Sequence, residues 1–143
     1  MQIKLKKLDE RAVVPTRGSS MAAGMDLYAL DAVTVEAGQT VLVHTGIALA
    51  IPEGYAGFIY ARSGLATKRS LAPANKVGVV DADYRGEIMV ALHNHGTVPQ
   101  TVDAGERVAQ MVVAPFLPVE FALAETLDET ARAEGGFGST GNK

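Results

Sequence analysis

The residues best suited to chemistry lie in one short stretch, residues 78–86, with the sequence GVVDADYRG. An apolar strand runs directly into the carboxylate of Asp81, and such a strand seldom ends on an acid unless something uses it. Tyr84 lies in the polar residues 83–86, which we predict to form a tight hairpin turn. A turn that holds one rigid carboxylate and one flat ring suits a base and a sugar. The alternative is a polar hairpin tip held by its own side-chain hydrogen bonds.

A second set of candidates, Arg62, Ser63 and Gly64, ends a predicted strand and opens a possible short helix over residues 64–70. The first turn of a helix has unpaired N–H groups and the positive end of the helix dipole, and both favour phosphate. The Arg62 guanidinium adds a fork of donors, and Ser63 adds a hydroxyl. Ser63 as a plain helix N-cap is the alternative, and the two roles are compatible.

Two polar residues stand alone in apolar surroundings. Asp26 lies in AGMDL, residues 23–27, and a carboxylate there can hold a metal ion directly or through water, although a turn or cap role is more usual. Gln110 ends GERVAQ, residues 105–110, in another apolar strand. An inward-facing amide needs partners, so Gln110 either bridges hydrogen bonds in the core or contacts a ligand.

The histidines give little indication of a metal site. His93 and His95 would share one face of a strand, which permits chelation, but no third ligand stands nearby in the sequence. His44 lies in an apolar strand and is predicted to be a core or interface residue.

The end of the chain changes character. Residues 122–132 are acidic and poor in turn signals, and residues 134–141 have the sequence EGGFGSTG. A flexible tail is the simplest interpretation of this composition. Phe137 among the glycines, preceded by Arg132, indicates more. Glycine N–H groups can line a phosphate-binding nest, and an aromatic ring can stack on a base.

Short strands separated by turns must position these side chains, and this spacing is typical of a β-sandwich or closed barrel. No repeat and no linker divides the chain, so we predict one domain with one possible short helix. The strand-like segments are residues 3–6, 33–36, 41–51, 55–61, 87–94, 98–102 and 107–114.

The composition excludes several classes of protein. The 143 residues can bury a core without disulfides, and the absence of cysteine excludes a thiol nucleophile or thiolate metal site. A net charge of −3 argues against binding nucleic acid through its phosphates, although it allows a small polyphosphate. No apolar run approaches the ~18 residues of a membrane helix. We therefore predict a soluble cytoplasmic protein that binds neither nucleic acid nor membrane.

Five segments, taken together, resemble the homotrimeric dUTP diphosphatase (dUTPase) family in their order and spacing. One of these motifs alone is a weak sign, whereas five in order across nearly the whole chain are a strong one. They are AGMDL at 23–27, RSGLA at 62–66, residues 75–86, GERVAQ at 105–110 and RAEGGFGSTG at 132–141.

The resemblance implies an all-β fold, a distorted jelly-roll β-barrel of the dUTPase-like β-clip type with at most one short helix. It implies one domain over residues 1–143 that forms a homotrimer with shared active sites. Residues 124–143 would be a glycine-rich arm that closes a neighbouring subunit's site. The implied reaction is Mg²⁺-dependent hydrolysis of dUTP to dUMP and pyrophosphate by water attack on the α-phosphorus. This reaction keeps uracil out of DNA and supplies dUMP for thymidylate synthesis.

The resemblance also implies a role for each matching residue. Asp81 would activate the attacking water, Arg62 would stabilise charge in the transition state, and Asp26 would reach Mg²⁺ through water. The substrate contacts would be Ser63, Gly64 and Gln110 on the phosphates, Asn75 and Gly78 at uracil, Tyr84 under the deoxyribose, Phe137 stacked on uracil beside Gly138, and Arg132, Ser139 and Thr140 on the γ-phosphate.

Two other functions stay open at this point. A dCTP deaminase resembles a dUTPase in fold but needs a glutamate where this chain has Ala91, and usually a second serine where this chain has Gly64. A non-catalytic trimeric scaffold that binds nucleotides or proteins is the other alternative, because a fold does not fix a function. Such a scaffold would have no need for the complete set of residues named above.

Overall fold

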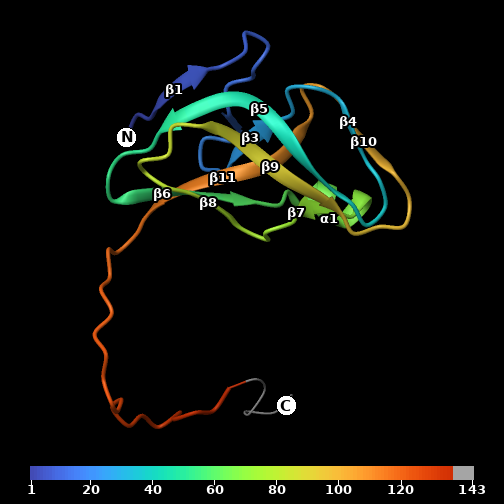
Figure 1. Ribbon diagram of the computed structural model, residues 1–143. Helices are drawn as coiled ribbons and strands as arrows, with labels where there is room; N and C mark the ends of the chain where they lie inside the picture. Colours follow the sequence, from blue (N-terminus) through green and yellow to red (C-terminus); the bar gives the residue numbers. More distant parts are fainter. Residues whose placement is uncertain (137–143) are drawn as a thin grey trace.

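Apolar segments form the long strands at the centre of the molecule, and one of them alternates strictly between buried and less buried side chains. In Glu87–Asn94 (β9), every second side chain is buried, beginning with Ile88. This strand pairs antiparallel with Thr40–Ala50 (β5). The bounds of β9 are those that the alternation predicts. Residues 1–136 are described in this computed structural model, and its long strands curve around a common core (Figure 1).

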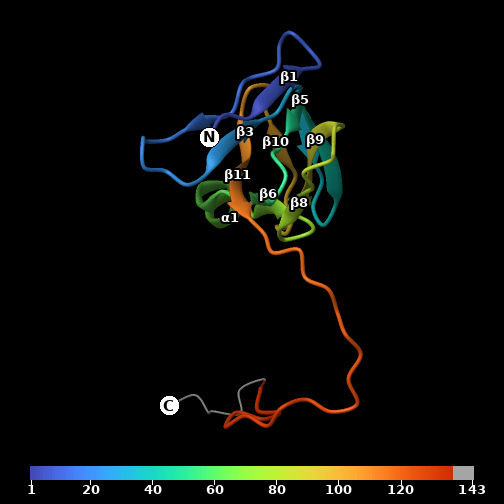
Figure 2. The same ribbon diagram turned by 90° about the vertical axis from the view of Figure 1, so that its left-hand side faces the viewer.

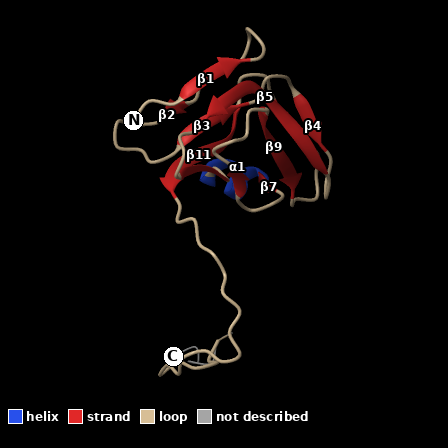
Figure 3. Ribbon diagram, turned by 60° about the vertical axis from the view of Figure 1, so that its left-hand side comes forward, coloured by secondary structure: helices blue, strands red, loops and turns tan. Residues whose placement is uncertain are grey.

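The strands form three antiparallel sheets within the described residues, and the prediction of an all-β fold with one short helix is confirmed. The connections cross repeatedly from one sheet to another, which gives a closed, layered arrangement (Figure 3). The first sheet has the order β1 (Lys4–Lys7), β5, β9, β7 (Leu71–Pro73). The second has the order β2 (Thr16–Arg17), β3 (Met25–Tyr28), β11 (Arg107–Pro115), β6 (Tyr55–Tyr60), β8 (Gly78–Val80). The third pairs β10 (Gln100–Val102) with β4 (Val33–Val35).

Aliphatic side chains from these sheets form one core, which includes Leu27, Leu92 and Met111. One polar residue, Asn94, is completely buried in it. Its side-chain amide donates to the carbonyl oxygens of Val35 at 2.9 Å and Val98 at 2.8 Å, and these bonds offset the desolvation of the amide.

The helix Ser63–Arg69 (α1) buries Leu65 and ends at Ser70, which has a left-handed φ of 55°. The expected span of 64–70 is therefore displaced by one residue. The N-cap residue is Arg62, whose side chain makes no capping hydrogen bond. The interpretation of Ser63 as the N-cap is wrong, because Ser63 already has helical geometry and lies in the first turn.

The predicted hairpin at residues 83–86 is also wrong. β8 pairs with β6, whereas β9 pairs with β5 and β7, so residues 81–86 cross from one sheet to the other. The polar residues and Gly86 do signal a change of direction. They carry no information about which strand β8 or β9 will pair with, because both partners lie elsewhere in the chain.

After Pro115 the chain leaves the barrel and runs away from it as an extended arm, as Figures 1 and 2 show. Residues 116–134 of this arm are all exposed. Within the described part of the chain, no helix is long and apolar enough to cross a membrane.

Candidate active site

A pocket of about 300 Å³, here called the Asp81 pocket, lies where the 81–86 crossing meets β5, β6 and β9. It brings together Asn75, Gly78, Asp81 and Tyr84, four of the residues predicted to bind or act on a substrate. The rest of its wall is largely aliphatic. The other lining residues are Leu42, Ile59, Val79, Val80, Glu87, Ile88, Met89 and Ala91.

Two glycines make this pocket possible. A Cβ at Gly78 would lie 3.2 Å from Cβ of Ile59 and 3.3 Å from Nδ2 of Asn75, so a side chain there would press on the Asn75 amide. A Cβ at Gly86 would lie 2.5 Å from Cζ of Tyr84. The Tyr84 ring therefore folds back over the backbone of residue 86, and its hydroxyl donates to the carbonyl oxygen of Glu87 at 3.1 Å.

Asp81 is exposed at the edge of this pocket. Its backbone carbonyl accepts the N–H of Tyr84 at 3.2 Å, which closes the turn that follows it. Across residues 1–136, its carboxylate forms no ion pair and accepts no hydrogen bond. The carboxylate is thus fixed at its base by β8 and free at its oxygens to hold a water molecule.

A second pocket of about 550 Å³, here called the Arg62 pocket, contains the other predicted residues of the barrel. It lies between β3, β11 and the start of α1. Antiparallel pairing places Gln110 beside both Asp26 on β3 and Tyr60 on β6, so these strands carry one polar row across the sheet. The lining residues are Gly18, Ala22, Ala23, Gly24, Asp26, Arg62, Ser63, Gly64, Arg107 and Gln110.

Two arginines share the carboxylate of Asp26, which is buried. Nε of Arg62 donates to Oδ1 at 2.7 Å, and Nη1 of Arg107 donates to Oδ2 at 3.4 Å. The three side chains together carry one net positive charge, which favours a polyanion. Arg107 was missed in the sequence, although it lies in the GERVAQ segment. A bulge between Arg107 and Ala109 pairs Arg107 with Tyr28, and so places it on the same face of the sheet as Asp26 and Gln110.

Gln110 forms a hydrogen bond within the fold and also lines a pocket, while its contact with a ligand stays a prediction. Its Nε2 donates to the carbonyl oxygen of Ala61 at 2.9 Å, and its side chain lines the Arg62 pocket. A Cβ at Gly24 would collide with Oε1 of Gln110. The glycine in AGMDL is therefore required by the packing of the amide against β3.

Gly64 differs from Gly24, because a Cβ at Gly64 would meet no atom within 4 Å. The fold of the single chain does not require glycine at this position. The N-cap residue Arg62 makes no side-chain hydrogen bond to the first N–H groups of α1, and this turn begins in the wall of the pocket.

The Asp81 pocket and the Arg62 pocket share no lining residue. Asp81 follows Val80, which stands opposite Gly57 on β6, whereas Arg62 lies beyond the other end of β6. The five residues from Gly57 to Arg62 span roughly 16 Å of extended chain. One chain therefore does not place Asp81 and Arg62 around a single phosphorus atom.

The three histidines contact other side chains of the protein. Among residues 1–136, no group of three or more His, Cys, Asp or Glu side chains converges. The rings of His93 and His95 contact each other, with centroids 4.4 Å apart, and Nδ1 of His93 lies 2.8 Å from Oγ1 of Thr40. His44 was predicted in the core or an interface, and its placement in the core is wrong. It is 55% exposed and its Nδ1 lies 2.8 Å from Oε2 of Glu87.

The predicted site residues of the arm make no contact with the barrel among the described residues. Arg132 is exposed, and its Nε donates to the carbonyl oxygen of Gly135 at 2.7 Å. Phe137, Gly138, Ser139 and Thr140 lie outside the described residues. Their predicted contacts with base and phosphate stay predictions.

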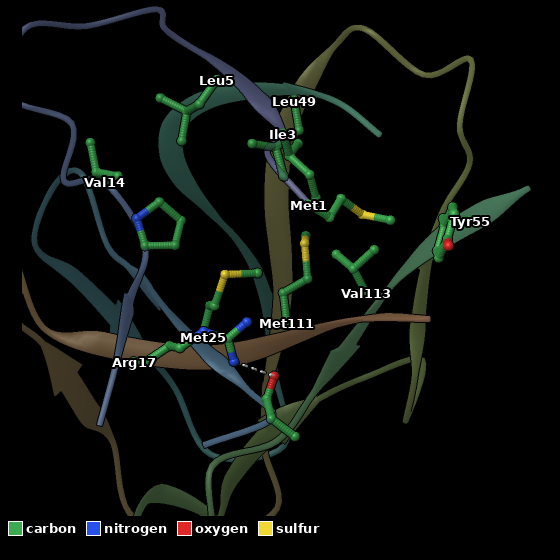
Figure 4. A pocket seen from close by; sticks show the side chains of 12 residues that line it. Met1, Ile3, Leu5, Val14, Arg17, Met25, Leu49, Tyr55, Met111 and Val113 are labelled. Atoms are coloured by element: carbon green, nitrogen blue, oxygen red, sulfur yellow. Dashed lines mark hydrogen bonds between the residues drawn. The ribbon is translucent and has the colours of Figure 1, made fainter. Parts of the chain in front are cut away.

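A third cavity, of about 440 Å³, contains none of the predicted residues (Figure 4). Its walls are aliphatic and sulfur-bearing side chains such as Ile3, Met25 and Met111. The one charged residue among them, Arg17, donates to the carbonyl oxygen of Ala23 at 3.3 Å. This cavity has no acid or base for hydrolysis.

Comparison with known proteins assigns the chain to a family. The sequence profile of the dUTPase family matches residues 10–141. The deoxyuridine 5'-triphosphate nucleotidohydrolase of Desulfitobacterium hafniense is 50% identical over 144 residues, which cover 99% of this chain and 95% of that protein. The protein of the same name from Oryza sativa is 48% identical over 139 residues, which cover 97% and 80% of the two chains.

A solved structure shows the same fold. A mutant dUTPase of Staphylococcus bacteriophage 80alpha with dUpNHpp has a TM-score of 0.92 and 26% identity, and the match covers 98% of each chain. The chain therefore belongs to the dUTPase family, and the predicted jelly-roll class of fold is confirmed.

Proposed function

We propose that this protein hydrolyses dUTP to dUMP and pyrophosphate, and that each active site combines the Asp81 pocket of one subunit with the Arg62 pocket of another. The observation that carries this proposal is the free carboxylate of Asp81 beside an amide, a glycine and an aromatic ring in one narrow pocket. Membership of the dUTPase family supports the reaction, and the roles of individual residues are the proposal made from the two pockets.

The Asp81 pocket suits uracil and deoxyribose. The Asn75 amide and the backbone beside Gly78 offer the donors and acceptors that a uracil edge needs. The aliphatic wall leaves little space for the methyl group of thymine. The clamped Tyr84 ring forms a floor for the sugar and restricts the space for a ribose 2′-hydroxyl.

The Arg62 pocket suits the triphosphate. Arg62, Arg107 and the Gln110 amide offer donors, and the uncapped turn of α1 adds backbone N–H groups. Because Arg62 is held by Asp26 at 2.7 Å, its guanidinium is fixed before a substrate arrives. A fixed cation stabilises developing negative charge without a reorganisation cost.

Mg²⁺ fits this pocket only as a hydrated ion held mainly by the substrate. Both oxygens of Asp26 already accept from arginines, but each keeps a further lone pair that can accept from a water molecule. Mg²⁺ in proteins keeps several waters and is often bound through substrate phosphates. When bound, the ion would neutralise charge on the phosphate oxygens.

The chemical step needs one base and one charge-stabilising group. Asp81 orients a water molecule and accepts its proton as the water oxygen bonds to the α-phosphorus. The bond between the α-phosphorus and the bridging oxygen breaks, and pyrophosphate leaves with its negative charge compensated by the Arg62 pocket. Positioning and electrostatic stabilisation supply most of the catalysis in such a reaction.

The division of the predicted site residues between two pockets supports a homotrimer. The separation of the two pockets in one chain is what a site between subunits requires. Exposed apolar residues also alternate along the arm, with Leu117 83% and Phe121 97% exposed. An extended segment of this pattern gains stability by lying against another chain. Residues 116–123 would therefore run along a neighbouring subunit, and residues 124–143 would close that neighbour's site.

The two alternatives are less favoured. Ala91 lines the Asp81 pocket where a deaminase needs its acid, and the other acid of that pocket, Glu87, has both oxygens occupied by protein donors. A scaffold without catalysis gives no reason for the free carboxylate of Asp81.

Pyrophosphate release from dUTP, dCTP, dTTP and UTP, measured in parallel with Mg²⁺ and with EDTA, tests the proposal. We expect pyrophosphate release from dUTP alone, and we expect EDTA to abolish this release. Ammonia release from dCTP would contradict the proposed function.

A further inference from the structure

One acidic side chain in the Asp81 pocket takes no part in the proposed chemistry. Glu87 begins β9 and lies close to Tyr84. Its Oε1 accepts the N–H of Gly46 at 2.8 Å, and its Oε2 lies 2.8 Å from Nδ1 of His44. The side chain is only 21% exposed. Its carboxylate is therefore a structural link between two elements.

Both partners of Glu87 lie on an irregular part of β5. The register pairs His44 with Met89 but Ala48 with Glu87, so β5 contains extra residues in between. Gly46 has a φ of 68°, and a Cβ there would lie 2.9 Å from Cβ of Ala12. The bulge removes its N–H groups from the regular ladder, and the carboxylate of Glu87 provides the acceptor that the Gly46 N–H needs.

The same residue holds Tyr84 through its backbone. The Tyr84 hydroxyl donates to the carbonyl oxygen of Glu87, and the ring lies over Gly86. Movement at the start of β9 would thus move the acceptor that fixes the ring. The ring is part of the pocket wall, so its position decides how much space is left beside it.

We propose that Glu87 is a positioning residue for sugar recognition: by joining the β5 bulge to the start of β9, it fixes the Tyr84 ring in the wall of the Asp81 pocket. This inference rests on the proposed function, in which the ring lies beneath the deoxyribose. A loosened ring leaves more room for a 2′-hydroxyl. Glu87 therefore affects the choice between deoxyribose and ribose as well as affinity.

The test is the ratio of the affinities for dUMP and UMP, measured by titration calorimetry. We expect Glu87→Ala to lower this ratio roughly fivefold, because a loosened ring excludes the 2′-hydroxyl of UMP less strictly. Glu87→Gln keeps one acceptor oxygen for Gly46 and should lower it less. Tyr84→Phe removes the hydroxyl that Glu87 acts through, so adding Glu87→Ala to Tyr84→Phe should change the ratio little further.

Asp31→Asn is the matched control, because Asp31 also pairs with a basic side chain, at 2.7 Å from Arg11, but lines none of the three cavities. It should keep the wild-type ratio. Additive effects of Glu87→Ala and Tyr84→Phe, or a wild-type ratio in both Glu87 variants, would overturn the positioning role. A wild-type protein that binds neither nucleotide would instead overturn the proposed function. If Glu87→Ala does not fold, Glu87→Gln decides the question alone.

Discussion

Asp81 is the residue on which the proposed reaction depends most. Its position after β8 gives it a fixed backbone, and no protein group across residues 1–136 competes for its carboxylate. These two properties suit a general base, which must be held in place and yet be free to bind water. Asp26 has the opposite environment, because it is buried and paired with two arginines.

We expect Asp81→Asn to lower kcat about a hundredfold to ten-thousandfold, the range of a lost general base, and to leave the affinity for a non-hydrolysable dUTP analogue unchanged. The amide keeps the size of the side chain but accepts no proton. Steady-state kinetics and calorimetric titration measure the two quantities. Near-normal turnover would remove Asp81 from the role of base.

Two glycines of the Arg62 pocket, Gly24 and Gly64, should respond differently to alanine. The methyl group of Gly64→Ala meets no protein atom, and alanine is favoured over glycine in a helix. We therefore expect the free energy of unfolding to rise by roughly 0.5 kcal/mol. The KM for dUTP should rise, because the new methyl group enters the predicted phosphate site. Thermal unfolding and kinetics on one preparation measure both effects.

Gly24→Ala is the comparison for this prediction. Its methyl group would collide with Gln110, so it should cost roughly 1–3 kcal/mol of stability as well as affinity. An unchanged KM in Gly64→Ala would show that Gly64 does not face the substrate.

At the scale of elements, the link between β5 and β9 should give the barrel an acid-sensitive contact. Burial raises the pKa of Glu87, but hydrogen bonds from His44 and Gly46 outweigh this effect and hold the pKa below its ordinary value. A carboxyl of this kind adds stability that is present above its unfolded pKa, about 4.3, and lost as the pH falls through the folded pKa.

We therefore expect the stability advantage of wild type over Glu87→Gln to be constant near neutral pH and to shrink below about pH 4. Chemical denaturation at a series of pH values measures this difference. A difference in the free energy of unfolding that stays constant down to the acid transition would show that the pKa of Glu87 is not depressed in the folded protein.

The elements show what local sequence can predict. Both ends of β9 were predicted correctly, because one face of this strand is buried and the other is not. β7, with three residues, was missed, since so short a strand has no measurable alternation and follows a helix directly. The pairing of β8 was predicted wrongly, because register depends on residues of β6 that lie about twenty positions earlier in the chain.

The site shows the same limit. Asn75, Gly78, Asp81 and Tyr84 were predicted and do gather in one pocket, because they lie within ten residues of one another. Arg107 was missed, and its contact with Asp26 spans 81 positions in the sequence. The expectation of a site shared between subunits likewise came from the resemblance and not from any pattern of residues.

At the scale of the whole molecule, we expect the barrel to fold without the arm. Deletion of residues 124–143 should leave the free energy of unfolding within about 0.5 kcal/mol of wild type, because residues 116–134 are exposed. The value of kcat/KM should fall at least tenfold, since Arg132 and the residues after it are predicted to close the site. Deletion of residues 142–143 alone is the control and should change neither quantity. Full activity without the arm would contradict its proposed role.

The most direct test of the shared site is complementation between two inactive variants. Asp81→Asn disables one pocket, and Arg62→Gln disables the other while it keeps a donor for Asp26. When the two are co-expressed in equal amounts, random assembly of a trimer with sites between subunits gives about a quarter of the sites an intact Asp81 and an intact Arg62. We predict that the mixture hydrolyses dUTP at about a quarter of the wild-type rate, although each variant alone is inactive. No recovery of activity in mixed trimers would contradict a site built between subunits.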